Sequence, residues 1–357
     1  MKPRFSARCA AESTLADAGR ILTRCGRHGL APAMSAPSPP SRINLGLLAL
    51  GLGGALVIAL VAWLGARAIG QEVLAALWVL PLTLGLHAVQ TWLSALAWRI
   101  ATGQPGPGVA RYTLARWVRE AVNSMLPVAQ MGGNLVGVRL LAQHGVPPAR
   151  GGAGVTLDMT VEAITQFIFT LAGIAALAAI SPDRSWAPWA EGFVALSVLA
   201  LAGFVLAQRV GLMRLIEAAA DRIPFLPKGL LRGLQAEWQR LQADRPALLR
   251  ATLLHMLASL LGLAETWLAL GAMGHTPSLA AALVVDSLGM AARSAGFAIP
   301  GALGVQEAGF ILAAGLVGQP PEAAIALSML KRARELVVGV TGLLVWQWVE
   351  GHRLVRK

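Results

Sequence analysis

Charged residues are scarce in this chain: Asp, Glu, Lys and Arg make up 13% of its 357 residues, whereas hydrophobic residues make up 56%. A soluble globular domain carries roughly 25% charged residues. This shortage of solvating side chains excludes an ordinary soluble domain. Several apolar runs reach the length of about 20 residues that a helix needs to cross about 30 Å of hydrocarbon. The composition therefore predicts an all-α, polytopic transmembrane helical bundle.

Residues that carry metal or redox chemistry are also few. The two cysteines, Cys9 and Cys25, lie in the polar N-terminal tail and imply no disulfide framework. The six histidines are scattered and make no spacing typical of zinc ligands. The segment "ARSAG" around Ser294 lacks the first glycine of a nucleophile elbow, and "GALGVQEAG" is not a phosphate-binding loop. We therefore expect no metal, no cofactor and no catalytic activity.

Acidic residues are outnumbered, with 18 Asp and Glu against 30 Lys and Arg and a net charge of +12. The basic excess is clustered: residues 1–42 and 209–250 are rich in Lys and Arg, whereas the loops "GHTPS" and "GQPPE" contain neither. Basic loops stay on the cytoplasmic side of a membrane. The distribution predicts a membrane protein with both termini in the cytoplasm, and not a nucleic-acid-binding protein. The membrane we expect is the bacterial cytoplasmic (inner) membrane.

The chain divides into one membrane domain and two tails. Residues 1–42 lack the apolar core of a signal peptide, so we expect a basic, disordered cytoplasmic tail in which Met34 is an alternative start. Residues 43–350 form a single transmembrane domain, and 351–357 form a second basic tail. Six full spans are predicted, at Asn44–Ala66, Val73–Trp98, Ala153–Ile180, Glu191–Ala207, Ala251–Met273 and Ala323–Val349.

The segment 209–250 is basic and partly amphipathic. One helical face would carry Leu230, Leu231, Leu234, Trp238 and Leu241. Such a segment is expected to lie on the cytoplasmic surface. It would serve as a connector with an interfacial face or as a docking surface.

Two stretches, Val109–Gln143 and Ser278–Val317, fit neither a span nor a loop. Each has an apolar approach, a Pro- and Gly-rich break and a second apolar piece too short to cross. Broken backbone at membrane depth requires protein or a watery cavity to satisfy its polar groups. We therefore predict two re-entrant helical hairpins.

The two halves of the chain repeat each other at a shift of 173 residues. Pro127, Pro147, Pro148 and Glu162 fall on Pro300, Pro320, Pro321 and Glu335. The repeats cover about 109–180 and 278–349. Three predicted spans separate the two hairpins, so the hairpins enter from opposite sides of the membrane. Inverted repeats of this kind are frequent in secondary transporters, whose binding sites lie near the midplane.

A cluster of charge falls inside the last predicted span. The pentapeptide "KRARE" begins about eight residues into it, and Glu335 aligns with Glu162. If the cluster were only a cap outside the membrane, the 14 residues that follow it would reach only about 21 Å, too short to cross. Because a charge at mid-membrane costs roughly 2.5–3.5 kcal/mol, these side chains require partners or water.

The candidate site gathers the polar side chains expected at this depth. Bases that would contact a lipid headgroup are Arg119, Arg293, Lys331, Arg332 and Arg334, and carboxylates that would orient them or exchange protons are Glu120, Asp158, Glu162, Glu307 and Glu335. Further polar candidates are Asn123, Gln130, Asn134 and Gln306. The second hairpin also supplies Asp286, and Glu265 in the fifth predicted span is a weaker candidate. Two interpretations stay open. The charges are buried ion pairs that lock the fold, or they line a hydrated cleft in which the bases take the anionic headgroup of an anionic or aminoacylated lipid and the carboxylates manage protons or cationic groups.

Four segments carry a resemblance to a known family: "WVREAVNSMLPVAQMGGNLVGVRLL", "DMTVEAITQ", "PGALGVQEAGF" and "LKRARELVVGVTGLLVWQW". In them the chain resembles the flippase-like membrane family related to the transmembrane flippase domain of lysylphosphatidylglycerol synthase, and within it the branch found beside hopanoid-biosynthesis genes. The similarity spans roughly residues 43–350. It implies lipid movement across or within the cytoplasmic membrane, without the aminoacyl-transfer activity of a soluble synthase domain.

The leading hypothesis is a lipid flippase or lipid-transport protein whose partners are a membrane lipid and the bilayer. One alternative is a scaffold that recruits lipid-biosynthesis enzymes through 209–250. Another is a membrane-embedded lipid transferase. A homo-oligomer is compatible with each of these hypotheses.

Overall fold

Helices, and no strand, form the part of the chain that the computed structural model describes, which is residues 65–103, 106–126, 132–222, 228–297 and 299–355 together with 55, 58, 62 and 63. The prediction of an all-α protein is confirmed. The predicted tail 1–42 and most of the predicted first span, Asn44–Ala66, lie outside the described residues.

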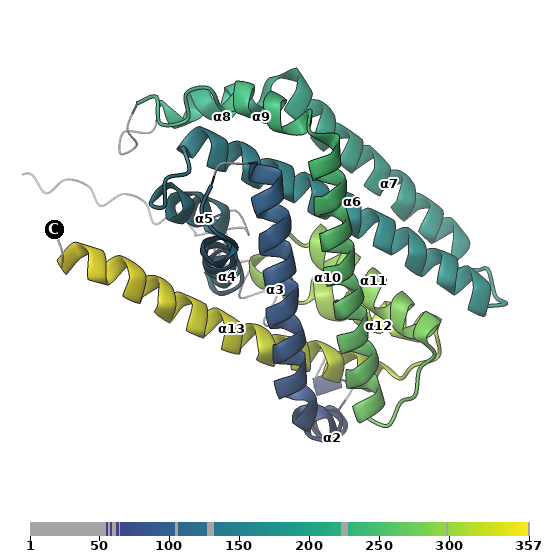
Figure 1. Ribbon diagram of the computed structural model, residues 1–357. Helices are drawn as coiled ribbons and strands as arrows, with labels where there is room; N and C mark the ends of the chain where they lie inside the picture. Colours follow the sequence, from purple (N-terminus) through teal and green to yellow (C-terminus); the bar gives the residue numbers. More distant parts are fainter. Residues whose placement is uncertain are drawn as a thin grey trace, which may run out of the picture. The chain divides into compact units, whose positions relative to one another are not determined.

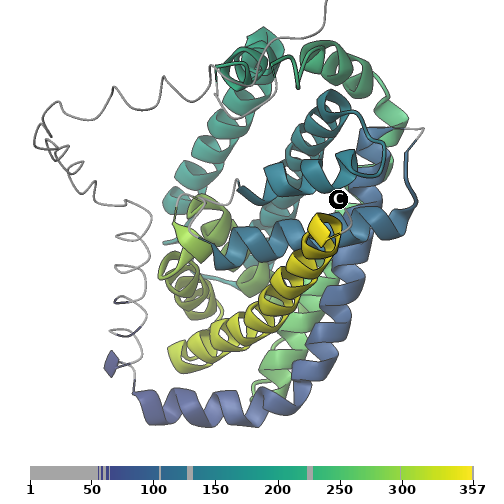
Figure 2. The same cartoon turned by 90° about the vertical axis from the view of Figure 1, so that its left-hand side faces the viewer.

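Two long helices, α3 (Leu80–Thr102) and α10 (Arg245–Ala272), lie side by side at the centre of the bundle and run in opposite directions (Figure 1). Pro81 in the first turn starts α3, because proline fits a helix start. The Asp244 carboxylate starts α10 by accepting a hydrogen bond from the Ala247 N–H at 3.0 Å. A short helix, α2 (Ala66–Ala76), and the turn Leu77–Val79 precede α3 and lie across its lower end (Figure 2).

The predicted second span, Val73–Trp98, lies within the apolar stretch Ala66–Thr102 and is interrupted by the turn Leu77–Val79. The helix axis changes direction at Leu77–Val79, and α3 takes over from Leu80. Pro81 is the physical reason, since it lacks the N–H that would continue the preceding helix.

Each central helix is followed by a helical hairpin. The first hairpin consists of α4 (Val109–Met125) and α5 (Gly132–Ala142), which pack against each other. The second consists of α11 (Leu279–Ala295), the turn η3 (Pro300–Ala302) and α12 (Val305–Leu316). Gly301 adopts a φ of 61°, which favours glycine at this sharp turn. Both predicted stretches are thus two short helices joined by a Pro- and Gly-rich break; the break 127–131 lies outside the described residues.

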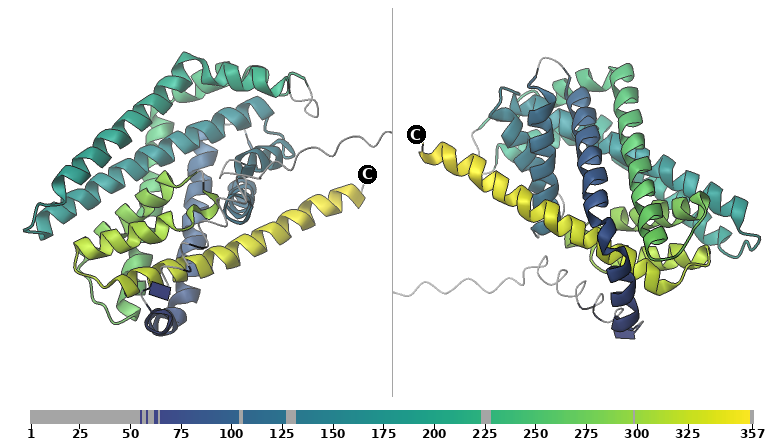
Figure 3. Two further views of the ribbon diagram at one scale, coloured as in Figure 1. Left: turned by 180° about the vertical axis from the view of Figure 1, so that it is seen from behind. Right: turned by 60° about the horizontal axis from the view of Figure 1, so that its bottom comes forward.

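Each hairpin is followed by a long helix, α6 (Pro148–Ile180) or α13 (Pro321–Val355), which starts at the second proline of a Pro-Pro pair. The two long helices run in opposite directions (Figure 1). Each long helix packs on the first helix of the other repeat's hairpin: α6 packs on α11, and α13 packs on α4 (Figure 3). Small residues permit both crossings. A Cβ added at Gly173 would lie 1.8 Å from Ser287 Oγ, and one added at Gly342 would lie 2.7 Å from the Ala121 Cβ.

The same order of elements therefore occurs twice, as α3–α4–α5–α6 and as α10–α11–α12–α13. The structural repeat is longer than the repeat found in the sequence, because it includes one more helix at its start, α3 or α10. Because α3 and α10 are antiparallel, the hairpins follow opposite ends of the central pair, as an inverted repeat requires. The tips of the hairpins approach each other, since a Cβ at Gly301 would lie 3.8 Å from the Ser124 carbonyl oxygen.

Between the repeats, α7 (Ala187–Ala207) returns alongside α6. None of its residues, all of which the structure describes, is buried. In the turn before α7, the Ser185 hydroxyl and N–H donate to the Asp183 carboxylate at 2.7 and 2.9 Å and hold its pKa below its usual range. Because α7 has no buried residue and packs mainly on α6, it is a peripheral helix.

The connection from α7 to α10 contains a π-helical turn (Gln208–Leu212), α8 (Met213–Ala220) and α9 (Leu234–Gln242). The predicted apolar face of 209–250 is present. Leu234, Trp238 and Leu241 are buried in a cluster with Leu157 and Met213. Since this face is covered by α6 and α8, it packs on the bundle and does not form a free interfacial face.

Four described stretches are long and apolar enough to cross a membrane: Ala66–Thr102, Pro148–Ile180, Ala187–Ala220 and Arg245–Ala272. They contain the second to fifth predicted spans. The last predicted span lies within α13, a continuous helix of 35 residues whose charges keep it outside this set. The total of six spans stays a prediction.

Candidate functional site

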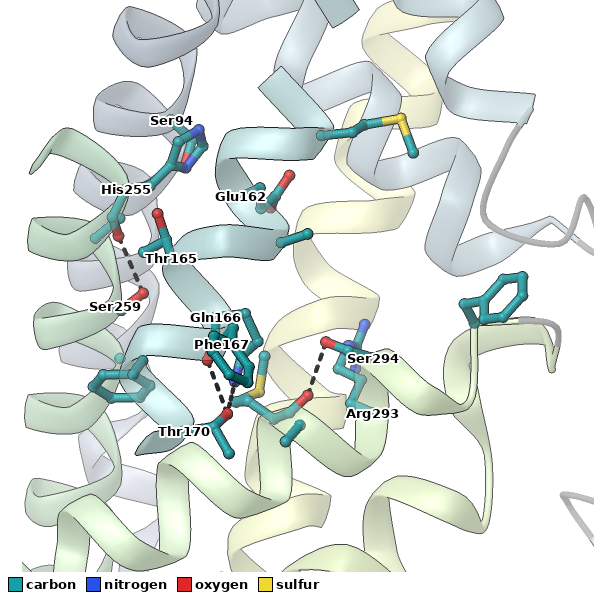
Figure 4. Close-up of a pocket in the computed structure, with 18 of the residues that line it drawn as sticks. Ser94, Glu162, Thr165, Gln166, Phe167, Thr170, His255, Ser259, Arg293 and Ser294 are labelled. Carbon is teal, nitrogen blue, oxygen red and sulfur yellow. Dashed lines mark hydrogen bonds between the residues drawn. The ribbon is translucent and has the colours of Figure 1, made fainter. Parts of the chain in front are cut away.

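A cavity of about 790 Å³ lies where both repeats meet. Helices α3, α4, α5, α6, α10, α11 and α13 supply its polar side, and α7 lines the other side. Figure 4 shows that the side chains around it come from both repeats, with Glu162 on α6 and Arg293 on α11. The size lies within the range of about 300–1,000 Å³ that is usual for small-molecule sites.

In the first repeat, two arginines of α4 bind two carboxylates of α6. Arg119 Nη1 lies 2.7 Å from Asp158 Oδ2, and Arg116 Nη2 lies 2.8 Å from Glu162 Oε1. Arg116 also reaches Asp158 at 3.3 Å, and His255 Nε2 of α10 lies 3.0 Å from Asp158 Oδ1. The Asp158 side chain is fully buried. Arg116, Arg119 and His255 compensate the free-energy cost of burying the Asp158 carboxylate, which is too large for a carboxylate without partners.

The spacing of these residues follows from helix geometry. Arg116 and Arg119 are three positions apart on α4, and Asp158 and Glu162 are four apart on α6, so each pair lies on one helix face. Arg119 is further supported by the Trp98 ring, whose centroid lies 5.5 Å from its Cζ.

In the second repeat the pairs are formed between α11, α12 and α13. Lys331 Nζ lies 3.1 Å from Asp286 Oδ1, which also accepts a hydrogen bond from the Thr266 hydroxyl at 2.6 Å. Arg293 Nη1 lies 2.6 Å from Glu335 Oε1. These contacts place Lys331 and Glu335 one turn apart, each facing a charge of opposite sign on α11.

Arg332 holds the second hairpin to α13. Its Nε lies 3.0 Å from Glu307 Oε1, and its Nη1 donates to the Gly301 carbonyl oxygen at 2.5 Å. Glu307 in turn accepts from the Gly304 N–H at 2.8 Å and from the Ser328 hydroxyl at 3.0 Å. This network holds the tip of the second hairpin against α13. It agrees with the interpretation of these charges as buried ion pairs that lock the fold.

The two equivalent glutamates differ in exposure. The Glu162 side chain is 43% exposed, whereas that of Glu335 is 9% exposed. Glu120 is the other open carboxylate of the cavity, at 31%, while the side chains of Arg119 and Lys331 are 7% and 4% exposed. On the polar side of the cavity, the side chains of Glu120 and Glu162 are therefore more exposed than those of Arg119 and Lys331.

The opposite side of the cavity is apolar. One face of α7 supplies Phe193, Leu196, Ala200, Leu201 and Phe204, which recur at helical spacing. Phe167 and Phe169 of α6 continue this surface. The cavity thus has a charged half and a hydrocarbon half, as an amphipathic molecule requires.

Eight of the predicted site residues line the cavity: Arg119, Glu120, Asn123, Asn134, Glu162, Arg293, Lys331 and Arg334. Five others, Asp158, Gln306, Glu307, Arg332 and Glu335, lie behind the lining and pair with residues of the wall or of the hairpin tip. Gln130 lies outside the described residues. The expectation that Arg332 contacts a headgroup is not met by its position, because Glu307 and Gly301 engage its guanidinium.

Several contributors lacked a sequence signal strong enough to identify them. Arg116 lies one turn before Arg119, a spacing that marks a shared helix face. His87 and His255 were single histidines in apolar helices, a pattern that is as common for buried structural residues. Only the pairing of α3 with α10 brings both to the cavity. The described residues contain no His, Cys, Asp and Glu group arranged to hold a metal ion.

Comparison with known families agrees with this architecture. The family described as the lysylphosphatidylglycerol synthase TM region matches residues 47–342. This chain belongs to that family. The family match covers the first repeat, most of the second and every residue that lines the cavity, and it ends within α13. With its apolar helices it makes the chain a multi-pass membrane protein of a family related to lipid handling. No curated protein and no solved structure matches the chain.

Proposed function

We propose that this protein moves a membrane lipid between the two leaflets, with the headgroup in the charged half of the cavity and the acyl chains along α7. The observation that carries the proposal is the two-sided lining of the cavity, with Glu120 and Glu162 open on one side and Phe193 and Phe204 on the other. A purely polar cavity would fit an ion, and a purely apolar one would fit a hydrocarbon.

The inverted repeat supports movement and not only storage. Two hairpins that follow opposite ends of the central pair allow the cavity to open alternately toward either side, as in transporters with inverted repeats. The peripheral position of α7, without a buried residue, gives lipid chains a lateral path to the bilayer.

A headgroup that carries a positive charge fits the cavity better than a purely anionic one. The most exposed charges are carboxylates, and the bases are already paired with Asp158, Asp286 or Glu335. Phosphate oxygens would have to displace those pairs. An ammonium group can instead reach Glu120, which has no Lys or Arg at ion-pair distance among the described residues, and Glu162, which is 43% exposed although Arg116 binds it. Aminoacylated or ethanolamine-type lipids are therefore proposed ahead of purely anionic lipids. This reverses the expectation that bases take an anionic headgroup.

Hopanoid handling and the inner-membrane location are narrower parts of the proposal. The hopanoid link rests on the resemblance, and the cytoplasmic placement of both termini rests on the distribution of Lys and Arg. Analysis of the lipids that co-purify with the protein tests the first, and labelling of cysteines placed near each end in intact cells tests the second. We propose no chemical change of the lipid, so its mass should be unaltered after incubation.

Reconstitution tests the proposal directly. Vesicles with the wild-type protein should flip a fluorescent phosphatidylethanolamine, measured by dithionite quenching, while protein-free vesicles should not. Ala163→Trp places an indole in the cavity and should reduce the rate at least tenfold. Gly203→Trp is the matched control, because Gly203 does not line the cavity and a Cβ added there would have no other atom within 4 Å. Equal rates in wild-type, Ala163→Trp and protein-free vesicles would refute lipid transport.

A further inference from the structure

The charged cluster around the cavity is not balanced. We define it as the charged side chains that line the cavity together with those connected to them through one or more successive ion pairs, as Glu307 and Arg332 are through Glu335 and Arg293. Within the described residues its permanent cations are Arg116, Arg119, Arg293, Lys331, Arg332 and Arg334, and its carboxylates are Glu120, Asp158, Glu162, Glu265, Asp286, Glu307 and Glu335. There is one carboxylate more than there are cations. An uncompensated charge in a low-dielectric interior is costly, so a further positive charge is required.

Glu120 is the carboxylate without a permanent counterpart. Each of the other six has a Lys or Arg nitrogen at ion-pair distance. Among the described residues the ion-pair partner of Glu120 is a histidine: His87 Nε2 lies 2.8 Å from Glu120 Oε1. His87 is 8% exposed, and among the described residues neither its Nδ1 nor its Nε2 makes a hydrogen bond, so the contact with Glu120 is one of ion-pair distance. A proton on this pair would supply the missing charge.

The surroundings of the pair leave room for that proton and for a competitor. The charged or titratable groups that share the cavity with the pair or act on it electrostatically are Arg116 and Arg119 of α4, Glu162 of α6, His255 and Glu265 of α10, Asp286 and Arg293 of α11, and Lys331, Arg334 and Glu335 of α13. All of the permanent cations among them have carboxylate partners of their own. The Glu120 side chain is 31% exposed to the cavity, so a bound cation can reach it.

We propose that the His87–Glu120 pair holds one exchangeable proton and that an ammonium-bearing headgroup displaces it on binding. The inference rests on the proposed lipid transport. The ammonium and the imidazolium compete for the same carboxylate. When the ammonium takes its place beside Glu120, the imidazolium releases its proton to water in the cavity, and the cation count of the cluster is unchanged.

Headgroup movement is coupled to proton movement, because the ammonium and the proton compete for the same pair. A headgroup that binds from one side expels a proton, and a proton that enters from the other side expels the headgroup. The two exchange in opposite directions, one for one. Because binding releases a proton, a lower pH must weaken the affinity, by up to about tenfold per pH unit.

Calorimetry on the purified full-length protein tests this exchange. Short-chain phosphatidylethanolamine is titrated into the protein in two buffers of different ionisation enthalpy, which gives the number of protons released. The titration is repeated between about pH 5 and pH 8, where histidine exchanges its proton. The wild type should release close to one proton per lipid at the acidic end. Short-chain phosphatidylglycerol, which lacks the ammonium, should release none.

Three variants locate the proton. His87→Gln should bind phosphatidylethanolamine without proton release and with an affinity independent of pH. Glu120→Gln removes the uncompensated carboxylate, so it should fold, bind weakly and release no proton. His275→Gln is the matched control, since His275 Nε2 lies 3.2 Å from Glu72 Oε1 in a similar pair away from the cavity. It should behave like the wild type.

The outcomes separate the two proposals. Binding by the wild type without proton release would overturn the exchange and leave lipid transport standing. Proton release that persists in both His87→Gln and Glu120→Gln would also overturn it. A wild type that binds neither lipid and flips none in vesicles would contradict the proposed function, and with it this inference.

Discussion

Glu162 of the first repeat and Glu335 of the second occupy equivalent positions, 173 residues apart, and both accept from arginine. Their surroundings differ. Glu162 faces the cavity with 43% of its side chain exposed, while Glu335 is closed in by Arg293 and Arg332. Under the proposed function, the first repeat offers the headgroup an exposed carboxylate. In the second repeat, Glu335 binds Arg332, which holds the tip of the hairpin.

The partners at the neighbouring position are reversed in sign. Asp158 of α6 aligns with Lys331 of α13, and each finds its opposite charge on the first helix of its own repeat's hairpin. Inverted repeats can thus conserve a pairing while exchanging its members. The difference shows that symmetry of the backbone does not impose symmetry of function on the side chains.

The largest expected effect comes from removing the anchor of the first repeat. Asp158→Ala would leave Arg116 and Arg119 buried with only Glu162 as a carboxylate partner. Loss of one member of a buried ion pair costs about 3–5 kcal/mol. The free energy of unfolding in mixed micelles should fall by this amount. A change below about 1 kcal/mol would show that the network is hydrated and not structural.

Substitution of the equivalent glutamates sharpens the comparison. Glu335→Gln should lower the free energy of unfolding by about 2–3 kcal/mol, because a buried charge-assisted hydrogen bond is lost. Glu162→Gln should change it by less than about 1 kcal/mol, as for a solvated pair. The transport rate should respond in the opposite way, with Glu162→Gln slower by about tenfold after correction for folded protein. Identical effects of the two substitutions would contradict the division of roles.

Smaller effects are expected where the long helices cross the opposite hairpins. Gly173→Ala would drive a methyl group into Ser287 and force α6 away from α11. Such overpacking costs typically 1–3 kcal/mol. Gly203→Ala on α7 is the control, because nothing lies within 4 Å of its Cβ, and it should be neutral to within about 0.5 kcal/mol. Equal stability of both variants, measured by thermal unfolding, would show that the crossing is loose.

The sequence predicted those features that follow from local chemistry. Pro and Gly breaks marked both hairpins, and the Pro-Pro pairs marked the starts of α6 and α13. Helical rise predicted which charges lie at a similar height along their helices, while their depth in the bilayer stays a prediction. Eight cavity-lining residues were predicted on this basis.

Direction around a helix was harder to predict than depth. Successive residues of α13 turn by about 100°, so Lys331 and Arg334 face the cavity while Arg332 faces α12. Nothing in "KRARE" distinguishes these faces, because its neighbours are uniformly apolar. His87 was missed for a related reason: its role depends on Glu120, which the fold brings to it from another helix.

Headgroup selectivity tests the central claim, that the open carboxylates of the first repeat receive the headgroup. The measurement is the initial flipping rate of acyl-labelled phosphatidylethanolamine relative to acyl-labelled phosphatidylglycerol in vesicles of one composition. The account predicts a preference of about tenfold for phosphatidylethanolamine in the wild type, lost in Glu162→Gln and retained in Gly203→Ala. An equal or faster rate for phosphatidylglycerol, unaltered by Glu162→Gln, would contradict it.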